Sequence, residues 1–215
     1  MNNLKLYIVR HGKTEFNEKG LMQGWSDGPL LESSIIQAQQ LGEKLIGNNI
    51  NITKVYSSDS FRTLNTSMQI LKGMNSSLKI HHMSDIREFY FGEGEGIPIS
   101  EVWGNVAKMK GYDSFEHLHS SLPMIDRVDF VHQTSEYSHA ESLEQFKSRI
   151  AKGLKQIEKE SKADDHILVV AHGLTIIGIL DYFGYSSDAI TSFENLSVTE
   201  INVESKEIVS IGKVY

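Results

Sequence analysis

The hydrophobic and polar positions of this chain form two kinds of pattern, short apolar runs and longer stretches at helical spacing. The apolar runs predict strands at residues 4–10, 52–56, 78–83 and 166–171, and near 196–203 and 207–214. Helical spacing predicts helices at residues 32–47, 60–72, 140–161 and 174–183. Strands that alternate with helices are typical of a largely parallel sheet. We therefore predict an α/β fold, a three-layer sandwich whose mostly parallel central sheet is flanked by helices.

Two long segments do not follow these patterns. Residues 11–30 contain three spaced glycines beyond Gly12 and then Pro29, which predicts a long ordered loop, and such loops are usually functional. Residues 92–139 open with Gly92-Glu93-Gly94-Glu95-Gly96 and show only patchy helical spacing. We interpret residues 92–139 as a lid-like, partly helical insertion that covers a site. A chain of 215 residues can form one domain, so we expect a single domain over 1–215.

Local signals also place the start of one helix and the first residues of the chain. Ser57-Ser58-Asp59 is expected to cap the helix at 60–72, because these residue types satisfy free N–H groups at helix starts. The first residues, Met1-Asn2-Asn3-Leu4-Lys5, lead directly into a strand and show no signal-peptide pattern.

Charge and cysteine content narrow the function classes. The net charge is −7, which argues against the broad basic surface that nucleic-acid binding requires. The chain has no cysteine, which excludes disulfides, thiolate zinc sites and a cysteine nucleophile. No apolar run approaches the length of a membrane span. We expect a cytoplasmic protein that binds neither nucleic acid nor membrane.

Arginine and histidine recur where predicted strands end. Arg10-His11-Gly12 follows the strand at 4–10, His172-Gly173 follows the strand at 166–171, and Arg62 lies shortly after the strand at 52–56. Ligands of parallel sheets bind at the carboxyl ends of the strands, so these side chains could converge on one anion such as phosphate. A histidine whose second ring nitrogen is held by an acceptor can attack phosphorus. A lone Arg-His-Gly tripeptide, however, is more often structural.

The tripeptide is not alone, and the ordered set of motifs resembles the histidine phosphatase superfamily, branch 1, also called phosphoglycerate-mutase-like. Each motif is weak by itself, but together they span nearly the whole chain. The matching blocks are Arg10-His11-Gly12-x-Thr14-x-x-Asn17, Gln23-Gly24-Trp25, Tyr56-Ser57-Ser58-Asp59 with Arg62, Arg87-Glu88, Ala140-Glu141-Ser142 and Val170-Ala171-His172-Gly173.

The resemblance implies a role for each matching residue. His11 would be the nucleophile that becomes phosphohistidine, and Glu88 would be the general acid and then the base for water. Arg10, Arg62 and His172 would clamp the phosphoryl oxygens. The alternative for Glu88 is a surface pair with an arginine, because charged residues are usually solvated. The residues expected to bind substrate are Thr14, Asn17, Gln23, Gly24 and Gly173.

Some positions depart from the family pattern without removing a catalytic group. These are Lys13, Leu31, Ser34 and Leu174. Lys13 would add positive charge beside the pocket, which leaves the substrate preference open.

The function that the resemblance implies is that of a histidine acid phosphatase-like phosphomonoesterase. It would hydrolyse a small phosphorylated metabolite through phosphohistidine, with no cofactor and no metal. His117-x-His119 supplies two candidate metal ligands, which is short of a site. One alternative is phosphoglycerate mutase-type transfer, although residues 92–139 lack the basic and tryptophan-containing stretches of true mutases. A second is a non-catalytic phosphate-binding module, which the intact catalytic set argues against.

The sequence does not indicate the substrate or the oligomeric state. Aromatic side chains near the predicted site could contact the substrate, although most are expected to pack the insertion onto the core. The candidates are Trp25, Phe89, Tyr90, Trp103, Tyr112 and Phe115. Edge strands could pair into a homodimer, but no residue pattern indicates it.

Overall fold

One six-stranded sheet forms the centre of the computed structural model, which describes residues 4–186, 190 and 192–215. The strand order is β3-β2-β4-β1-β5-β6, and β3, β2, β4 and β1 run parallel. β5 runs antiparallel to both of its neighbours, β1 and β6. This confirms the predicted α/β fold with a mostly parallel sheet. Residues 1–3, part of the start considered for a signal peptide, lie outside the described residues. The strands are β1 (Lys5–Arg10), β2 (Lys54–Ser58), β3 (Ile80–Met83), β4 (His166–Ala171), β5 (Val198–Asn202) and β6 (Glu207–Lys213).

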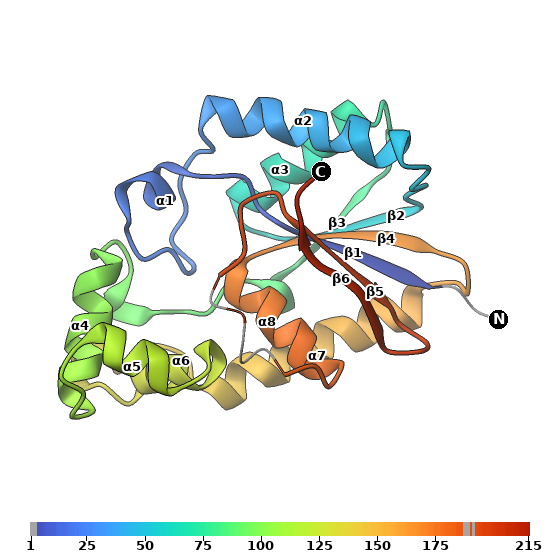
Figure 1. Ribbon diagram of the computed structural model, residues 1–215. Helices are drawn as coiled ribbons and strands as arrows, with labels where there is room; N and C mark the ends of the chain where they lie inside the picture. The colour runs from blue at the N-terminus through green and yellow to red at the C-terminus, as the bar shows by residue number, and fades with distance from the viewer. Residues whose placement is uncertain (1–3, 187–189, 191) are drawn as a thin grey trace.

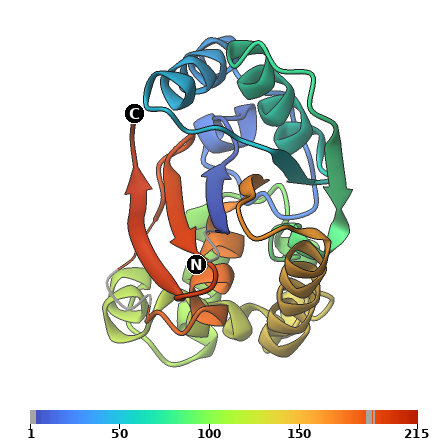
Figure 2. The same cartoon turned by 90° about the vertical axis from the view of Figure 1, so that its right-hand side faces the viewer.

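Helices cover both faces of the sheet and complete three layers (Figures 1 and 2). α2 (Glu32–Gly47) and α3 (Phe61–Gly73) lie on one face, and α7 (Leu143–Glu160) and α8 (Gly173–Tyr182) lie on the other. Alternate residues of β1 enter the two cores, because successive strand side chains point to opposite faces. Tyr7 and Val9 join one core, and Leu6 and Ile8 join the other.

Residues 92–139 form three further helices at the end of the molecule toward which β1 runs (Figure 1). They are α4 (Ile99–Met109), α5 (Phe115–Ser121) and α6 (Met124–His132), with 3-10 turns η1 (Ser84–Ile86) and η2 (Gly92–Gly94) before them and η3 (Ser135–Tyr137) after. Val102, Leu118 and Val128 belong to the same buried cluster as α7 and α8, so these helices pack onto the main core. No helix within the described residues is long and apolar enough to cross a membrane.

The loop predicted at 11–30 contains a short helix, α1 (Glu15–Lys19), so that prediction was wrong in part. Thr14 and Asn17 form a capping box at its start, and Gly20 ends it in the left-handed conformation. Five residues are too few to give a periodic hydrophobic signal, which is why the pattern missed this helix.

The predicted cap of α3 was also wrong, because its acceptor comes from elsewhere in the chain. Ser58 ends β2, and Asp59 forms a salt bridge with Arg87 at 2.6 Å. The side chain of Asp27, in the 11–30 segment, accepts hydrogen bonds from the N–H groups of Phe61 and Arg62. The helix start is therefore tied to a loop more than thirty residues earlier.

Close packing of α2 against α3 gives a prediction for stability. A Cβ built on Gly42 would lie 2.1 Å from the Ile70 carbonyl oxygen, whereas one on Gly104 of α4 would meet nothing within 4 Å. We expect Gly42→Ala to lower the free energy of unfolding by about 1–3 kcal/mol. Gly104→Ala, the matched control in an open helix, should be neutral or stabilising by up to about 1 kcal/mol. Urea denaturation followed by circular dichroism measures both, and equal stabilities would contradict the packing argument.

Candidate active site

Three strand ends bring the predicted histidines and arginines to one edge of the sheet. Arg10 ends β1 and pairs in register with Ala171, which ends β4. The N–H of His11 donates to the Ala171 carbonyl over 3.0 Å, which sets His11 beside His172. The centroids of the two imidazole rings are 5.3 Å apart. Arg62 lies in the first turn of α3, directly after β2, which is the other neighbour of β4.

Hydrogen bonds fix the protonated nitrogen of each imidazole. His11 Nδ1 lies 2.8 Å from the Gly12 carbonyl, and because a carbonyl only accepts, Nδ1 carries the proton and Nε2 keeps its lone pair. His172 Nδ1 lies 3.0 Å from Arg62 Nη2, and because arginine only donates, the proton of His172 is on Nε2. Asn195 donates to the His11 carbonyl over 2.8 Å and holds its backbone. One ring can act as a nucleophile and the other as a donor.

The guanidinium of Arg62 is fully buried and is held by the loop at residues 24–27. Nη1 donates to the Ser26 carbonyl at 2.9 Å and to Asp27 Oδ1 at 3.1 Å. Nη2 donates to the Gly24 carbonyl at 2.7 Å. These bonds, with the one to His172, fix the plane and direction of the guanidinium before any ligand arrives.

Several buried donors at this edge lack a partner among the described residues. They are Nε of Arg10, Nε of Arg62, Nε2 of His172 and Nε2 of Gln23. A buried donor left unpaired costs about 1–3 kcal/mol, and such groups are rare in native proteins. All four nitrogens donate, so the partner that would satisfy them must offer acceptor oxygens, as a phosphate does.

The Glu88 carboxylate lies against the N-terminus of α8. Oε2 accepts from the Leu174 N–H at 3.2 Å, and Oε1 accepts from the N–H groups of Thr175 at 3.2 Å and Phe89 at 3.0 Å. Its side chain is buried, so the alternative of a surface pair with an arginine was wrong. The positive end of the helix dipole adds to these bonds in holding the carboxylate.

Burial shifts the pKa values of these groups in opposite directions. Burial raises the pKa of Glu88, although the N–H groups of Phe89 and Leu174 and the two nearby guanidinium groups act against it. Burial, and then the charges of Arg62 and Arg10, lowers the pKa of His11 well below 6.5. Burial and Arg62 also lower the pKa of His172. Both imidazoles are therefore neutral near pH 7, and Glu88 retains a proton more readily than an ordinary glutamate.

The backbone around Glu88 is held by two side chains that the sequence did not single out for this role. Arg149 donates to the Glu88 carbonyl at 2.7 Å and to the Arg87 carbonyl at 2.6 Å, and it forms a salt bridge with Glu141 at 2.6 Å. Trp25 Nε1 donates to the same Glu88 carbonyl at 3.0 Å. Because Arg149 follows Glu88 by 61 residues, only the folded chain reveals the contact.

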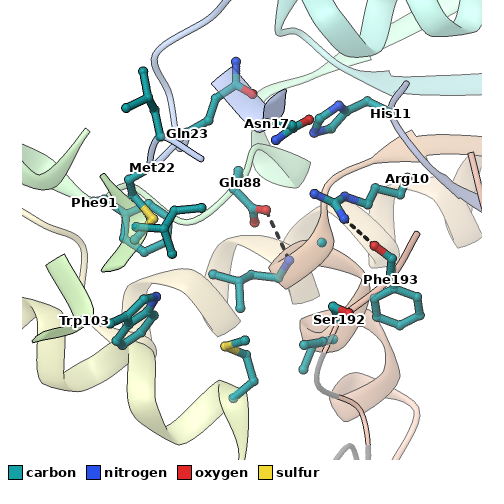
Figure 3. A pocket seen from close by; sticks show the side chains of 16 residues that line it. Arg10, His11, Asn17, Met22, Gln23, Glu88, Phe91, Trp103, Ser192 and Phe193 are labelled. Atoms are coloured by element: carbon teal, nitrogen blue, oxygen red, sulfur yellow. Dashed lines mark hydrogen bonds between the residues drawn. The ribbon is translucent and has the colours of Figure 1, made fainter. Parts of the chain in front are cut away.

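A cavity of about 240 Å³ opens beside these groups. Figure 3 shows most of its polar side chains on one side of Glu88 and most of its apolar side chains on the other, although Phe193 lies beside Arg10. The polar side holds Arg10, His11 and Asn17, and the apolar side holds Met22, Phe91 and Trp103. Pockets for drug-sized ligands measure about 300–1,000 Å³, so this cavity suits a small molecule.

The residues predicted to bind substrate occupy different positions. Asn17, Gln23 and Gly173 line the cavity. Thr14 is buried, and its hydroxyl caps α1 and donates to Gln23 Oε1 at 2.8 Å. Gly24 lies against backbone, where an added Cβ would be 2.4 Å from the Phe89 carbonyl. Thr14 and Gly24 therefore shape the loop and do not face this cavity.

Of the aromatic side chains considered for specificity, only Trp103 lines the cavity. Phe89 is buried in the core between Phe91 and Phe146, and Phe115 stacks on Trp103. The apolar lining from other segments was not predicted from the sequence. The adjacent pair Leu21-Met22, apolar within a glycine-rich loop, was a signal that could have found part of it.

The two candidate metal ligands have other neighbours. His117 Nδ1 lies 3.5 Å from an Asp113 oxygen, and His119 contacts Arg127. Within the part of the chain that the structure describes, no group of three or more histidine, aspartate or glutamate side chains is arranged to hold a metal ion.

Comparison with known families shows which family carries this arrangement of histidines, arginines and glutamate. Residues 6–212 match the family model of the histidine phosphatase superfamily, branch 1. The chain belongs to that superfamily. The match extends over nearly the whole chain, so the resemblance seen in the sequence motifs is confirmed.

Proteins with different functional names resemble this chain. The crystal structure of a phosphoglycerate mutase from Bacillus anthracis is 33% identical, covers 98% of this chain and 93% of its own, and has a TM-score of 0.90. A protein of Hydrogenobacter thermophilus with the provisional name phosphoserine phosphatase 2 is 28% identical, covering 94% of this chain and 91% of its own. A broad-specificity phosphatase of Saccharomyces cerevisiae is 36% identical over 47% of this chain and 44% of its own. The first comparison confirms the phosphoglycerate-mutase-like fold.

The lowered pKa values of His11 and His172 predict how stability depends on pH. As the pH falls through about 6.5, these two histidines bind protons in the unfolded chain but not in the folded chain. Their contribution to the free energy of unfolding is therefore fully present above pH 6.5 and decreases as the pH drops below it. Each histidine contributes a slope of up to about 1.4 kcal/mol per pH unit. We expect His172→Gln to reduce the slope between pH 6.5 and 5, measured by urea denaturation. Comparing wild type with His172→Gln cancels the contributions of the other titratable groups. If the free energy of unfolding changed with pH equally in both proteins, the prediction would be contradicted.

Proposed function

We propose that this protein is a metal-independent phosphatase that hydrolyses small phosphomonoesters through phosphohistidine at His11. One observation carries the proposal: unpartnered buried donors lie at the same end of the sheet as His11, an imidazole whose Nδ1 donates to a carbonyl and whose Nε2 therefore keeps its lone pair. Membership of the histidine phosphatase superfamily and the names of its phosphatase relatives support the same activity. The reaction takes its nucleophile and its charge stabilisation from side chains.

The reaction would proceed in two displacements. Nε2 of His11 attacks phosphorus, the P–O bond to the alcohol breaks, and protonated Glu88 gives its proton to the leaving oxygen. Glu88, now a carboxylate, takes a proton from water, whose oxygen attacks phosphorus as the N–P bond breaks. Phosphate leaves, and both residues return to their starting states. The raised pKa of Glu88 and the lowered pKa of His11 suit these roles.

Charge in the transition state would be stabilised by the fixed donors. Arg10, Arg62 and His172 direct N–H groups toward the oxygens of the transferring phosphoryl group, whose charge spreads during transfer. Because Arg62 is already held by the loop at 24–27, little reorganisation accompanies the reaction.

The cavity favours hydrolysis over the mutase alternative. A phosphoglycerate carries a carboxylate besides its phosphate, and a mutase must hold that group as well. Among the described residues that line the cavity, Arg10 is the only arginine or lysine. Mutase activity stays the second candidate because the Bacillus anthracis mutase is 33% identical. The donors also suit the third candidate, a non-catalytic phosphate-binding module, but such a module would not require a buried glutamate with a raised pKa beside them.

We also propose a cellular location, an assembly and a domain organisation for this protein. We propose a cytoplasmic location from the cysteine-free sequence, and a single domain whose segment 92–139 acts as a lid. A homodimer would form through β3 or β6, the two edge strands of the sheet.

The central test is turnover of p-nitrophenyl phosphate between pH 5 and 8 with excess EDTA. We expect chelator-resistant hydrolysis that falls by at least about 10³-fold in His11→Ala, because the nucleophile is removed. A rapid-quench sample of wild type should show a mass increase of one phosphoryl group, and the variant should not. Isomerisation of 3-phosphoglycerate without hydrolysis would favour the mutase. Phosphate binding without turnover would favour the binding module.

The role of Glu88 predicts a dependence on the leaving group. Glu88→Gln cannot supply a proton, so it should slow hydrolysis of alkyl phosphates far more than that of p-nitrophenyl phosphate, whose phenolate leaves unaided. General acid catalysis contributes about 10²–10⁴-fold, and we expect a loss of that size for glycerol 1-phosphate. The measurement is kcat for each ester in wild type and in Glu88→Gln. An equal loss of kcat for the two esters would mean that Glu88 does not act as the general acid.

A further inference from the structure

The cavity beyond the phosphoryl end is lined by apolar side chains from three distant segments. The loop after α1, the helices α4 and α6, and the first turns of α8 each contribute. Figure 3 shows part of this lining, Met22 and Trp103, on the opposite side of the cavity from His11 and Arg10. The apolar lining includes Leu21, Met22, Ile99, Trp103, Met124 and Ile177.

This apolar lining, called the apolar wall below, contains side chains buried in the core and a more exposed side chain at its rim. Met22 and Trp103 are each 5% exposed, whereas Ile99 at the start of α4 is 38% exposed. Phe115 stacks on Trp103 with ring centroids 6.1 Å apart, which holds the indole in place. A ligand group entering here would therefore meet a preformed apolar surface.

The charged and titratable groups lie at the other end. Among the described lining residues these are Arg10, His11 and Glu88, all of which the proposed reaction uses. The uncharged polar lining consists of Asn17, Gln23 and Ser192. A carboxylate or the hydroxyls of a sugar, placed against the apolar wall, would lose water without gaining hydrogen bonds, which costs free energy.

We infer that the substrate is a monophosphate ester of an alcohol that carries an aromatic or branched aliphatic group close to the ester oxygen. This inference rests on the proposed function and narrows its substrate class. The phosphate occupies the donors around His11, and the apolar group fills the wall formed by Trp103 and its neighbours. The helices of segment 92–139 thus share in specificity with the loop after α1 and with α8, and Ile99 is a specificity residue at the rim.

Binding of non-hydrolysable phosphonates tests the wall independently of catalysis. Benzylphosphonate and methylphosphonate share the anionic group and differ in the apolar substituent. We expect benzylphosphonate to bind wild-type protein at least about tenfold more tightly by isothermal titration calorimetry, because a well-filled apolar pocket discriminates to that extent. Equal affinities would overturn the inference.

A matched pair of variants locates the preference. Ile99 and Met109 both lie on α4 and are both exposed, but only Ile99 lines the cavity. Ile99→Lys should reduce the preference for benzylphosphonate several-fold, and Met109→Lys should leave it as in wild type. A preference that survives Ile99→Lys, or falls equally in both variants, would contradict the assignment of Ile99.

Turnover separates this inference from the proposed function. The esters 2-phenylethyl phosphate and glycerol 1-phosphate both release primary alcohols, so their leaving groups are matched. The inference predicts a kcat/KM at least about tenfold higher for 2-phenylethyl phosphate. Hydrolysis of both at equal rates would overturn the substrate class and leave the phosphatase in place. Hydrolysis of neither would overturn the phosphatase, while the phosphonate titration would still decide whether the wall selects an apolar group.

Discussion

The buried positive charge of Arg62 is the constraint on which the site depends. A charge removed from water must be compensated by hydrogen bonds or by a partner of opposite sign. The chain supplies both from one loop, through the carbonyls of Gly24 and Ser26 and the carboxylate of Asp27. A helix or strand would have used those carbonyls in its own hydrogen bonds. The loop is therefore irregular because its backbone acceptors are needed elsewhere.

The apolar side of the cavity and the carboxyl group of Glu88 depend on each other. Phe91 and Leu174 line the cavity beside Glu88, and burial is the first cause of its raised pKa. Because N–H groups at the start of α8 satisfy the carboxylate oxygens, Glu88 can be buried without a salt bridge. The surroundings that would recognise an apolar leaving group would thus also help the neighbouring carboxyl to keep, up to a higher pH, the proton that a general acid must donate.

Hydrophobic patterning was enough to predict the fold class, the six strands and the helices that flank them, since strand and helix periods are local properties of the chain. Strand ends then indicated that Arg10, His11 and His172 would meet, because parallel strands end at one edge. The cap of α3 by Asp27 and the support of Glu88 by Arg149 could not be predicted in this way. Both are contacts between distant segments, and neither leaves a periodic signal. The apolar wall escaped prediction for the same reason, since its members come from separate elements.

The place of β1 in the sheet has a consequence for synthesis of the protein on the ribosome. Lys5 in β1 pairs with His166 on one side and with Asn202 on the other. The apolar residues Leu6–Val9 therefore leave the exit tunnel long before either neighbouring strand exists. Long-range pairing of this kind slows folding and leaves apolar segments open to aggregation. His11, which follows this strand directly, can reach its working geometry only after β4 and β5 have been made, so the nascent protein should be inactive until then.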